Sequence, residues 1–235
     1  YHYGLKNYEY RFKTKQPAIP HGKTKINRKA NDQLEKDEKL LVITEQGLGD
    51  TLQYMRYVPY LKKQGINISF CAQEKLHSLI KSSGIHENPL SPEQSILISE
   101  GEWISLLSLP KYLKVSPANP VIIEPYIRST VKLNKKWKNL FSQEKRPIVG
   151  INWQGNPNME KSFYQGRSIP LERFSQLLNN NEITFLSLQK GFGSDQLDHS
   201  SFKNKFIECQ SLINSTWDFL ENAAIIENCD LIITC

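Results

Sequence analysis

One stretch of the sequence, residues 39–65, passes from a strand pattern to a helix pattern through a tight turn. The apolar run Leu40 to Thr44 predicts a strand of a parallel sheet that is buried on both faces. Residues 50–64 carry apolar side chains at helical spacing, with a kink expected at Pro59, and Gly65 is a natural end for this helix. If this strand–turn–helix unit recurs along the chain, the fold belongs to the α/β class.

The same alternation continues in two series. After the first unit we expect a strand at residues 66–70, a helix over 76–84 and strand candidates at 95–99 and 103–109. The second series predicts strands at residues 147–153, 183–189, 205–209 and 230–234, and helices over 169–180 and 215–228, the last with a capping box at Ser215 and Asp218. Two such series predict an α/β fold of two doubly wound, Rossmann-like domains.

The expected domain boundaries follow from these series. Residues 1–38 combine a short aromatic stretch with a polar, turn-rich segment, which is typical of a junction. The first domain then covers residues 39–130, a lysine-rich linker covers 131–146, and the second domain covers 147–235. Because crossovers in parallel sheets are right-handed, ligand sites are expected at the carboxyl ends of the strands.

Charge and cysteine patterns bear on other classes of function. The 235 residues include 30 Lys and Arg against 24 Asp and Glu, a net charge of +6. Much of the excess lies in lysine-rich runs that are typical of solvated surface, and no recognition motif accompanies them, so nucleic-acid binding is the weakest hypothesis.

The four cysteines and five histidines lack the spacing of zinc ligands, so no metal is expected. No apolar run approaches the ~20 residues that span a bilayer and no signal sequence opens the chain, which predicts a cytoplasmic protein.

The turn at Gly47 and Gly49 argues against two kinds of nucleotide-binding motif in the first domain. Leu52 stands where a dinucleotide fingerprint needs its third glycine, and the turn lacks the G-K-[ST] of a P-loop. What remains is a small-residue turn followed by Asp50, for which two interpretations stay open. Asp50 is either the N-cap of the helix, with Gln53 completing a capping box worth ~1 kcal/mol, or a general base that faces a cleft.

Two polar loops of the second domain carry cations at expected strand ends. The loop at residues 154–167 contains Lys161 and Arg167, and Arg167 precedes a helix start, where free backbone N–H groups favour an anion. Gln189 and Lys190 end the next strand ahead of a glycine-rich loop, and a lysine there can pair with phosphate as a point charge. The alternative for both cations is an ordinary solvated side chain.

Several segments, taken together, carry a family resemblance. They are, in order, EQGLGDTLQYMRYVPYLKKQG, VGINWQGNPN, GRSIPLERFSQLL, FLSLQKG and DFLENAAIIENCDLIIT. From about Lys39 to Cys235 the chain resembles the family-nine, heptosyltransferase-like glycosyltransferase region found behind tetratricopeptide repeats in many bacterial proteins. The resemblance implies a GT-B architecture of two Rossmann-like domains. The acceptor, a glycan or protein hydroxyl, would lie mainly on the first domain, and a nucleotide-sugar donor mainly on the second.

The resemblance also implies roles for individual residues. Transfer would be metal-independent with inversion at the sugar carbon, so the nucleotide sugar is a co-substrate and no cofactor is needed. Asp50 would be the base for the acceptor hydroxyl, while Arg167 and Lys190 would offset charge on the leaving nucleotide diphosphate, because no metal supplies that charge. The full set of expected substrate-binding residues is Gly47, Gly49, Asn156, Arg167, Gln189 and Lys190.

By the same resemblance we expect this chain to be a fragment. Near its start, the segment LKNYEYRF looks like the end of a repeat region, and the family continues after DLIIT into an Asp-Ser/Thr turn and a helix that holds the diphosphate. The second domain is therefore expected to be incomplete and the chain to be inactive by itself. A competing hypothesis is a non-catalytic module of the same fold that binds a glycan or a nucleotide.

Overall fold

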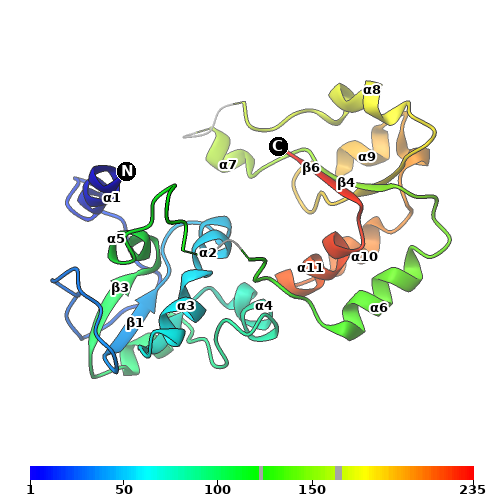
Figure 1. The fold of residues 1–235 in the computed structure, drawn as a ribbon. Coiled ribbons are helices and arrows are strands. Elements are labelled where there is room, and N and C mark those ends of the chain that lie inside the picture. Colours follow the sequence, from blue (N-terminus) through cyan, green and yellow to red (C-terminus); the bar gives the residue numbers. More distant parts are fainter. Residues whose placement is uncertain (122–123, 162–165) are drawn as a thin grey trace. The chain divides into compact units, whose positions relative to one another are not determined.

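The computed structural model describes residues 1–121, 124–161 and 166–235, and it divides into two compact units, Tyr1–Arg128 and Ser129–Cys235 (Figure 1). Each unit contains a three-stranded parallel sheet accompanied by helices. The α/β class predicted from the sequence is confirmed at this level. Parallel strands need crossover connections, which is why helical segments lie between the strands of each unit along the chain.

The first sheet has the strand order β2-β1-β3, with β1 in the centre. Its strands are β1 Lys39–Ile43, β2 Asn67–Cys71 and β3 Glu102–Ser105. The helices of this unit are α1 His2–Tyr8, α2 Leu48–Tyr54, α3 Tyr57–Lys63, α4 His77–Ser82 and α5 Leu109–Tyr112, with 3-10 turns η1 Glu9–Phe12, η2 Glu74–Leu76, η3 Gln94–Leu97 and η4 Leu106–Ser108. Central strand β1 is apolar on both faces because both are covered, as its continuous apolar run predicted.

The strand expected at residues 95–99 is wrong, because this segment forms η3. Ser95 Oγ lies 2.7 Å from the Pro92 carbonyl oxygen and 2.8 Å from that of Lys23. A serine hydroxyl bonded to nearby backbone offers the chain an alternative to ladder pairing. Leu97 is 76% exposed, so the apolar letters that suggested a strand do not mark a buried one.

The helix predicted over residues 50–64 is broken into α2 and α3, and it begins two residues earlier, at Leu48. Pro59 has no N–H to donate to the Met55 carbonyl oxygen, which instead accepts from Val58 N–H at 3.1 Å. The expected kink is therefore a full break at residues 55–56. Gly65 ends α3 in the left-handed conformation, with φ of +83°.

Residues 1–38 belong to the first unit rather than standing apart from it. Trp103 in β3 exchanges backbone hydrogen bonds with Asn27 and Lys29, both at 3.0 Å, so this segment pairs along the edge of the sheet. His21 N–H donates to the Thr44 carbonyl oxygen at 2.8 Å, beyond the end of β1. The segment expected to be a junction thus covers the sheet edge.

A buried ion pair fastens this segment to the end of β1. Glu45 is fully buried, and its Oε1 lies 2.5 Å from Arg11 Nη2 in η1. Ser105, at the end of β3, donates a hydrogen bond to the same carboxylate. The Arg11 guanidinium lies 4.1 and 4.3 Å from the ring centroids of Tyr8 and Phe12. Arginine suits this position because its flat group stacks on rings while its N–H groups bind the carboxylate.

The second sheet has the order β5-β4-β6, with β4 Ile148–Asn152, β5 Thr184–Ser187 and β6 Leu231–Thr234. The strands expected at 147–153, 183–189 and 230–234 are confirmed. Gly150 sits at the centre of the sheet, where a Cβ would lie 2.8 Å from Ile232 Cδ1 and from Leu188 Cδ1. The helices are α6 Val131–Leu140, α7 Pro157–Glu160, α8 Ser175–Leu178, α9 Asp195–His199, α10 Gln210–Ser215 and α11 Phe219–Glu227, with 3-10 turns η5 Leu171–Phe174 and η6 Lys203–Lys205.

The strand predicted at residues 205–209 is reduced to a single bridge between Phe206 and Phe185. Ile207 N–H still donates to the Phe185 carbonyl oxygen at 2.8 Å, but Cys209 N–H turns back to Ile207 at 2.9 Å. This tight turn leads the chain away from the sheet edge and into α10. The short apolar run at residues 205–209 therefore pairs with β5 at one residue only and does not form a strand.

Helix α6 occupies much of the predicted linker and packs beside α11 in the second unit (Figure 1). Trp137 of α6 is fully buried, and its Nε1 donates to Glu221 Oε1 of α11 at 3.0 Å. The capping box expected at Ser215 and Asp218 is wrong, since Ser215 ends α10. Asp218 alone caps α11 by accepting from Leu220 N–H at 3.1 Å.

We predict that Glu45→Gln destabilises the protein by about 3 kcal/mol, because it leaves the Arg11 charge buried without its main partner. The loss is at the low end of the range for broken buried pairs, since Glu9 also contacts Arg11, at 2.9 Å. Urea unfolding measures the change. The exposed pair of Lys39 and Glu100 provides the control: Glu100→Gln should cost less than about 1 kcal/mol. Equal effects of the two variants would contradict a special role for the buried pair.

Candidate functional site

The carboxyl edge of the first sheet gathers the loops that follow β1 and β2. Thr51 Oγ1 in α2 donates to Gln73 Oε1, beyond β2, at 2.9 Å. Gln73 Nε2 is 3.4 Å from the Gln46 carbonyl oxygen, which belongs to the turn after β1. These contacts fix the turn that carries the predicted acid at the edge where parallel sheets place their ligands.

Asp50 is the third residue of α2, and Gly47 is the N-cap. The expectation that Asp50 caps the helix with Gln53 is therefore wrong, because the helix starts at Leu48. Asp50 Oδ2 instead reaches back to accept the Gly47 N–H at 3.0 Å, as the acid of a capping box does. Its other oxygen, Oδ1, has no hydrogen bond to any residue that the structure describes. One oxygen holds the turn and the second is available to a ligand.

The two glycines of this turn differ in what requires them. A Cβ on Gly47 would lie 3.2 Å from Asp50 Oδ2, so a side chain there would crowd the carboxylate. Gly49 has no atom within 4 Å of such a Cβ and is exposed. Gly47 therefore serves the position of Asp50, whereas Gly49 leaves the first turn of α2 uncovered.

In the second unit, Gln189 ties together the loops at the carboxyl edge of β4 and β5. It is 2% exposed, and its Oε1 accepts from Trp153 N–H at 3.1 Å and Gln154 N–H at 2.9 Å. Its Nε2 donates to the carbonyl oxygens of Gln154 at 3.0 Å and Phe192 at 2.6 Å. A buried amide with these backbone partners positions the loops. It does not present itself to a ligand.

Further glutamines, which the sequence reasoning did not single out, extend this clamp. Gln196 Nε2 in α9 donates to Gln154 Oε1 at 2.8 Å, and its own Oε1 accepts from Leu171 N–H at 2.9 Å. Gly193 has a φ of +79°, and a Cβ there would lie 2.2 Å from Gln154 Oε1. The sequence signal was present, since Gln154 and Gln189 both follow strands that pair in the sheet.

Lys190 contacts Thr216, and two exposed aromatic residues lie close to these two residues in the sequence. Its Nζ is 2.9 Å from Thr216 Oγ1, which joins the loop after β5 to the segment before α11. Trp217, next to Thr216, is 65% exposed, and Phe192, two residues beyond Lys190, is 57% exposed. Large rings that face solvent can stack on a flat ligand, and a lysine ammonium group can pair with an anion. The sequence reasoning missed both rings, although each is flanked in the sequence by polar residues or glycines that are typical of exposed loops.

Arg167 packs against the loop that follows β4. A Cβ on Gly155 would lie 2.1 Å from Arg167 Nη2, so the guanidinium rests on a bare stretch of backbone. Glu160 Oε1 is 3.8 Å from Arg167 Nε, and Gly155 N–H donates to Ser168 Oγ at 3.0 Å. Asn156, just before α7, is exposed, with Oδ1 accepting from Asn158 N–H at 3.0 Å. Of the loop expected at 154–167, residues 162–165 lie outside the described ones.

The expected site residues therefore form two groups. Asp50, Gly47 and Gly49 lie at the carboxyl edge of the first sheet. The other four lie on the loops after β4 and β5, which pair in the second sheet, and these residues are Asn156, Arg167, Gln189 and Lys190. Among the residues that the structure describes, no group of three or more His, Cys, Asp and Glu is arranged to hold a metal ion.

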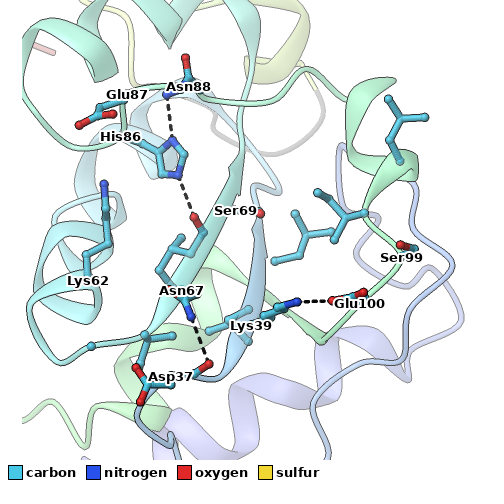
Figure 2. Close-up of a pocket in the computed structure, with 17 residues that line it drawn as sticks. Asp37, Lys39, Lys62, Asn67, Ser69, His86, Glu87, Asn88, Ser99 and Glu100 are labelled. Carbon is cyan, nitrogen blue, oxygen red and sulfur yellow. Dashed lines mark hydrogen bonds and ion pairs between the residues drawn. The ribbon is translucent and has the colours of Figure 1, made fainter.

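A cavity of about 790 Å³ lies at the other end of the first sheet, around the amino ends of β1 and β2 (Figure 2). Lys39 forms an ion pair with Glu100 at its rim, and Asn67 Nδ2 donates to the Asp37 carbonyl oxygen at 3.1 Å. The His86 side chain forms part of the cavity wall. Because sites of parallel sheets lie at the carboxyl ends, the volume of this cavity does not make it the candidate site.

Comparison with models of protein families, with curated proteins and with solved structures finds no match in any of the three. No helix within the described part of the chain is long and apolar enough to cross a membrane. The candidate site therefore stands on its own geometry.

We predict that stability falls as the pH drops from 7.5 to 5.5. His86 Nδ1 accepts from Asn88 N–H at 3.2 Å, so its Nε2 carries the hydrogen and donates to the Ile68 carbonyl oxygen at 2.9 Å. Burial lowers the pKa of His86, and that of His21 as well. The unfolded chain thus binds protons more readily near pH 6.5, and the stabilisation is complete above that pH and lost below it.

Melting temperatures measured across this range test the prediction. In His86→Gln the pH dependence should shrink to the part contributed by His21. A dependence of unchanged size in this variant, or stability that rises on acidification, would contradict the assignment.

Proposed function

We propose that the protein is a metal-independent, inverting glycosyltransferase of the GT-B type, related to the heptosyltransferase-like family that its sequence resembles. The observation that carries the proposal is the Asp50 carboxylate at the carboxyl edge of the first sheet, with Oδ2 fixed by Gly47 and Oδ1 without a partner among the described residues. A preoriented carboxylate with an available oxygen is what a general base requires.

Features of the second unit support a nucleotide-diphosphate donor. Lys190 and Arg167 bring two cations to the loops of one sheet edge, where they would stabilise the charge that develops on the leaving diphosphate. We assign the exposed rings of Trp217 and Phe192 to stacking on the nucleotide base. Gln189 would act as a positioning residue, because its amide is spent on the backbone of these loops.

The proposed step is a single displacement at the sugar carbon. The acceptor hydroxyl oxygen forms a bond to that carbon while Asp50 takes the hydroxyl proton. The bond from the carbon to the diphosphate oxygen breaks, and its electron pair leaves with the nucleoside diphosphate. Attack from the face opposite the leaving group inverts the configuration. A glycan or protein hydroxyl is the acceptor in this scheme.

A second candidate is a binding module of the same fold without catalysis. It is favoured by the structural engagement of the same side chains: Asp50 holds the turn at Gly47, and Lys190 holds Thr216. Nucleoside diphosphate binding without transfer to any acceptor would support this candidate. The two candidates predict the same ligand for the second unit and differ only in the role of the carboxylate.

Replacing Asp50 with Asn should lower transfer by at least about 100-fold, the usual contribution of a general base. The amide oxygen can still accept from Gly47 N–H, so the fold and the affinity for nucleoside diphosphate should persist. The assay measures nucleoside diphosphate released from a panel of nucleotide sugars, with and without glycan acceptors. Each variant is assayed beside the unchanged chain under the same conditions.

Glu74→Gln is the matched control, since Glu74 is an exposed acid that follows β2 at the same sheet edge. It should leave transfer unchanged. If Asp50→Asn loses nucleotide affinity together with activity, the carboxylate has a structural role and the catalytic assignment fails.

We also predict that nucleoside diphosphates quench tryptophan fluorescence through Trp217. Trp137 and Trp153 are fully buried, so a stacked base would affect Trp217 most directly. Titration with ADP, GDP and UDP should give a saturable signal that Trp217→Leu removes and Trp103→Phe retains. Quenching of equal size in Trp217→Leu would exclude this ring as the base platform.

A further inference from the structure

A separate cavity of about 630 Å³ lies entirely within the first unit, among α3, the end of α4 and the segment at residues 124–128. It involves none of the residues assigned to glycosyl transfer. Three of its lining side chains are cations, Arg56, Lys63 and Arg128, and one is an acid, Glu124. The cavity therefore carries an excess of positive charge.

The cations differ in how they are held. Arg56 Nε donates to the Gln53 carbonyl oxygen at 2.7 Å, and its guanidinium lies 4.9 Å from the ring centroid of Tyr126. Lys63 Nζ and the Arg128 guanidinium make no hydrogen bond or ion pair with the residues that the structure describes. One cation is thus oriented by the protein, and two can turn toward a bound anion.

The wall that carries Arg128 is fastened in place. Ser83 Oγ accepts the Arg128 N–H at 2.9 Å and lies 3.3 Å from the Arg128 carbonyl oxygen. Tyr126 donates its hydroxyl hydrogen to the Leu52 carbonyl oxygen. These bonds tie the segment to α4 and to α2, so a ligand would meet a wall that is already formed.

The cavity is also lined by the rings of Pro59 and Tyr60 in α3 and of Pro125, and by Ser82. Rings of this kind pack against the C–H face of a sugar, while hydroxyl groups bond to sugar hydroxyls. The charges suit a phosphate, and the walls suit the sugar that carries it.

We propose that this cavity binds a small phosphorylated sugar, with its phosphate held by Arg56, Lys63 and Arg128. The proposal does not depend on glycosyl transfer, because the site lies in the first unit and uses neither Asp50 nor the loops of the second sheet.

Calorimetry on the whole chain tests it with glucose 1-phosphate, inorganic phosphate and glucose as probes. Glucose 1-phosphate should bind more tightly than inorganic phosphate, and glucose should not bind detectably. Lys63→Gln and Arg128→Gln should each weaken glucose 1-phosphate binding roughly tenfold, the loss expected for one charge-assisted hydrogen bond. Lys62→Gln is the matched control on the same helix, and it should bind as the unchanged protein does.

Binding of glucose 1-phosphate no tighter than that of inorganic phosphate would overturn the proposal. So would an affinity that Lys63→Gln and Arg128→Gln leave intact. A loss in Lys190→Gln without a loss in Lys63→Gln would assign the phosphate to the second unit and overturn it as well. Glycosyl transfer is tested with Asp50→Asn, and binding of the sugar phosphate is tested with Lys63→Gln. Failure of one proposal is therefore distinguishable from failure of the other.

Discussion

The buried pair of Arg11 and Glu45 is the interaction on which the first unit depends. Glu45 lies two residues after the end of the central strand and starts the turn that leads to Asp50, so its position sets where that turn begins. A carboxylate without solvent is costly unless it is paired and hydrogen-bonded, and here Arg11 and Ser105 supply both. The pair joins the amino-terminal segment, β1 and β3 at one point. It thus links three pieces of chain that are far apart in the sequence.

In the second unit, an uncharged side chain rather than an ion pair holds the loops at the carboxyl edge of the sheet. Gln189 follows β5, is buried, and bonds to backbone groups of both neighbouring loops. A neutral amide needs no counter-ion, so no charged partner is required to hold these loops. In both units a buried polar residue fixes the loop. The candidate chemistry sits on nearby residues that are more exposed, Asp50 in one unit and Lys190 in the other.

Local pattern predicted the α/β class and the principal strands because a strand covered on both faces must be apolar along its length. It failed at residues 95–99 and 205–209, where short apolar runs met turn-forming hydrogen bonds instead of a neighbouring strand. It also placed Asp50 at the wrong helix position, because the N-cap depends on where the helix begins. The partner of Glu45 lies 34 residues away in sequence, and no local spacing encodes such a contact. Trp217 and Phe192 were missed because exposure of an aromatic ring is decided by the tertiary fold.

The contact between Gly155 and Arg167 links two positions that are separated by a long polar loop. The guanidinium occupies the space that a β-carbon at residue 155 would need, so even an alanine there would displace the Arg167 side chain. Evolution cannot vary these two sites independently. Among natural variants of this sequence, a side chain at 155 should occur together with a shorter residue at 167, and the pair should change in concert.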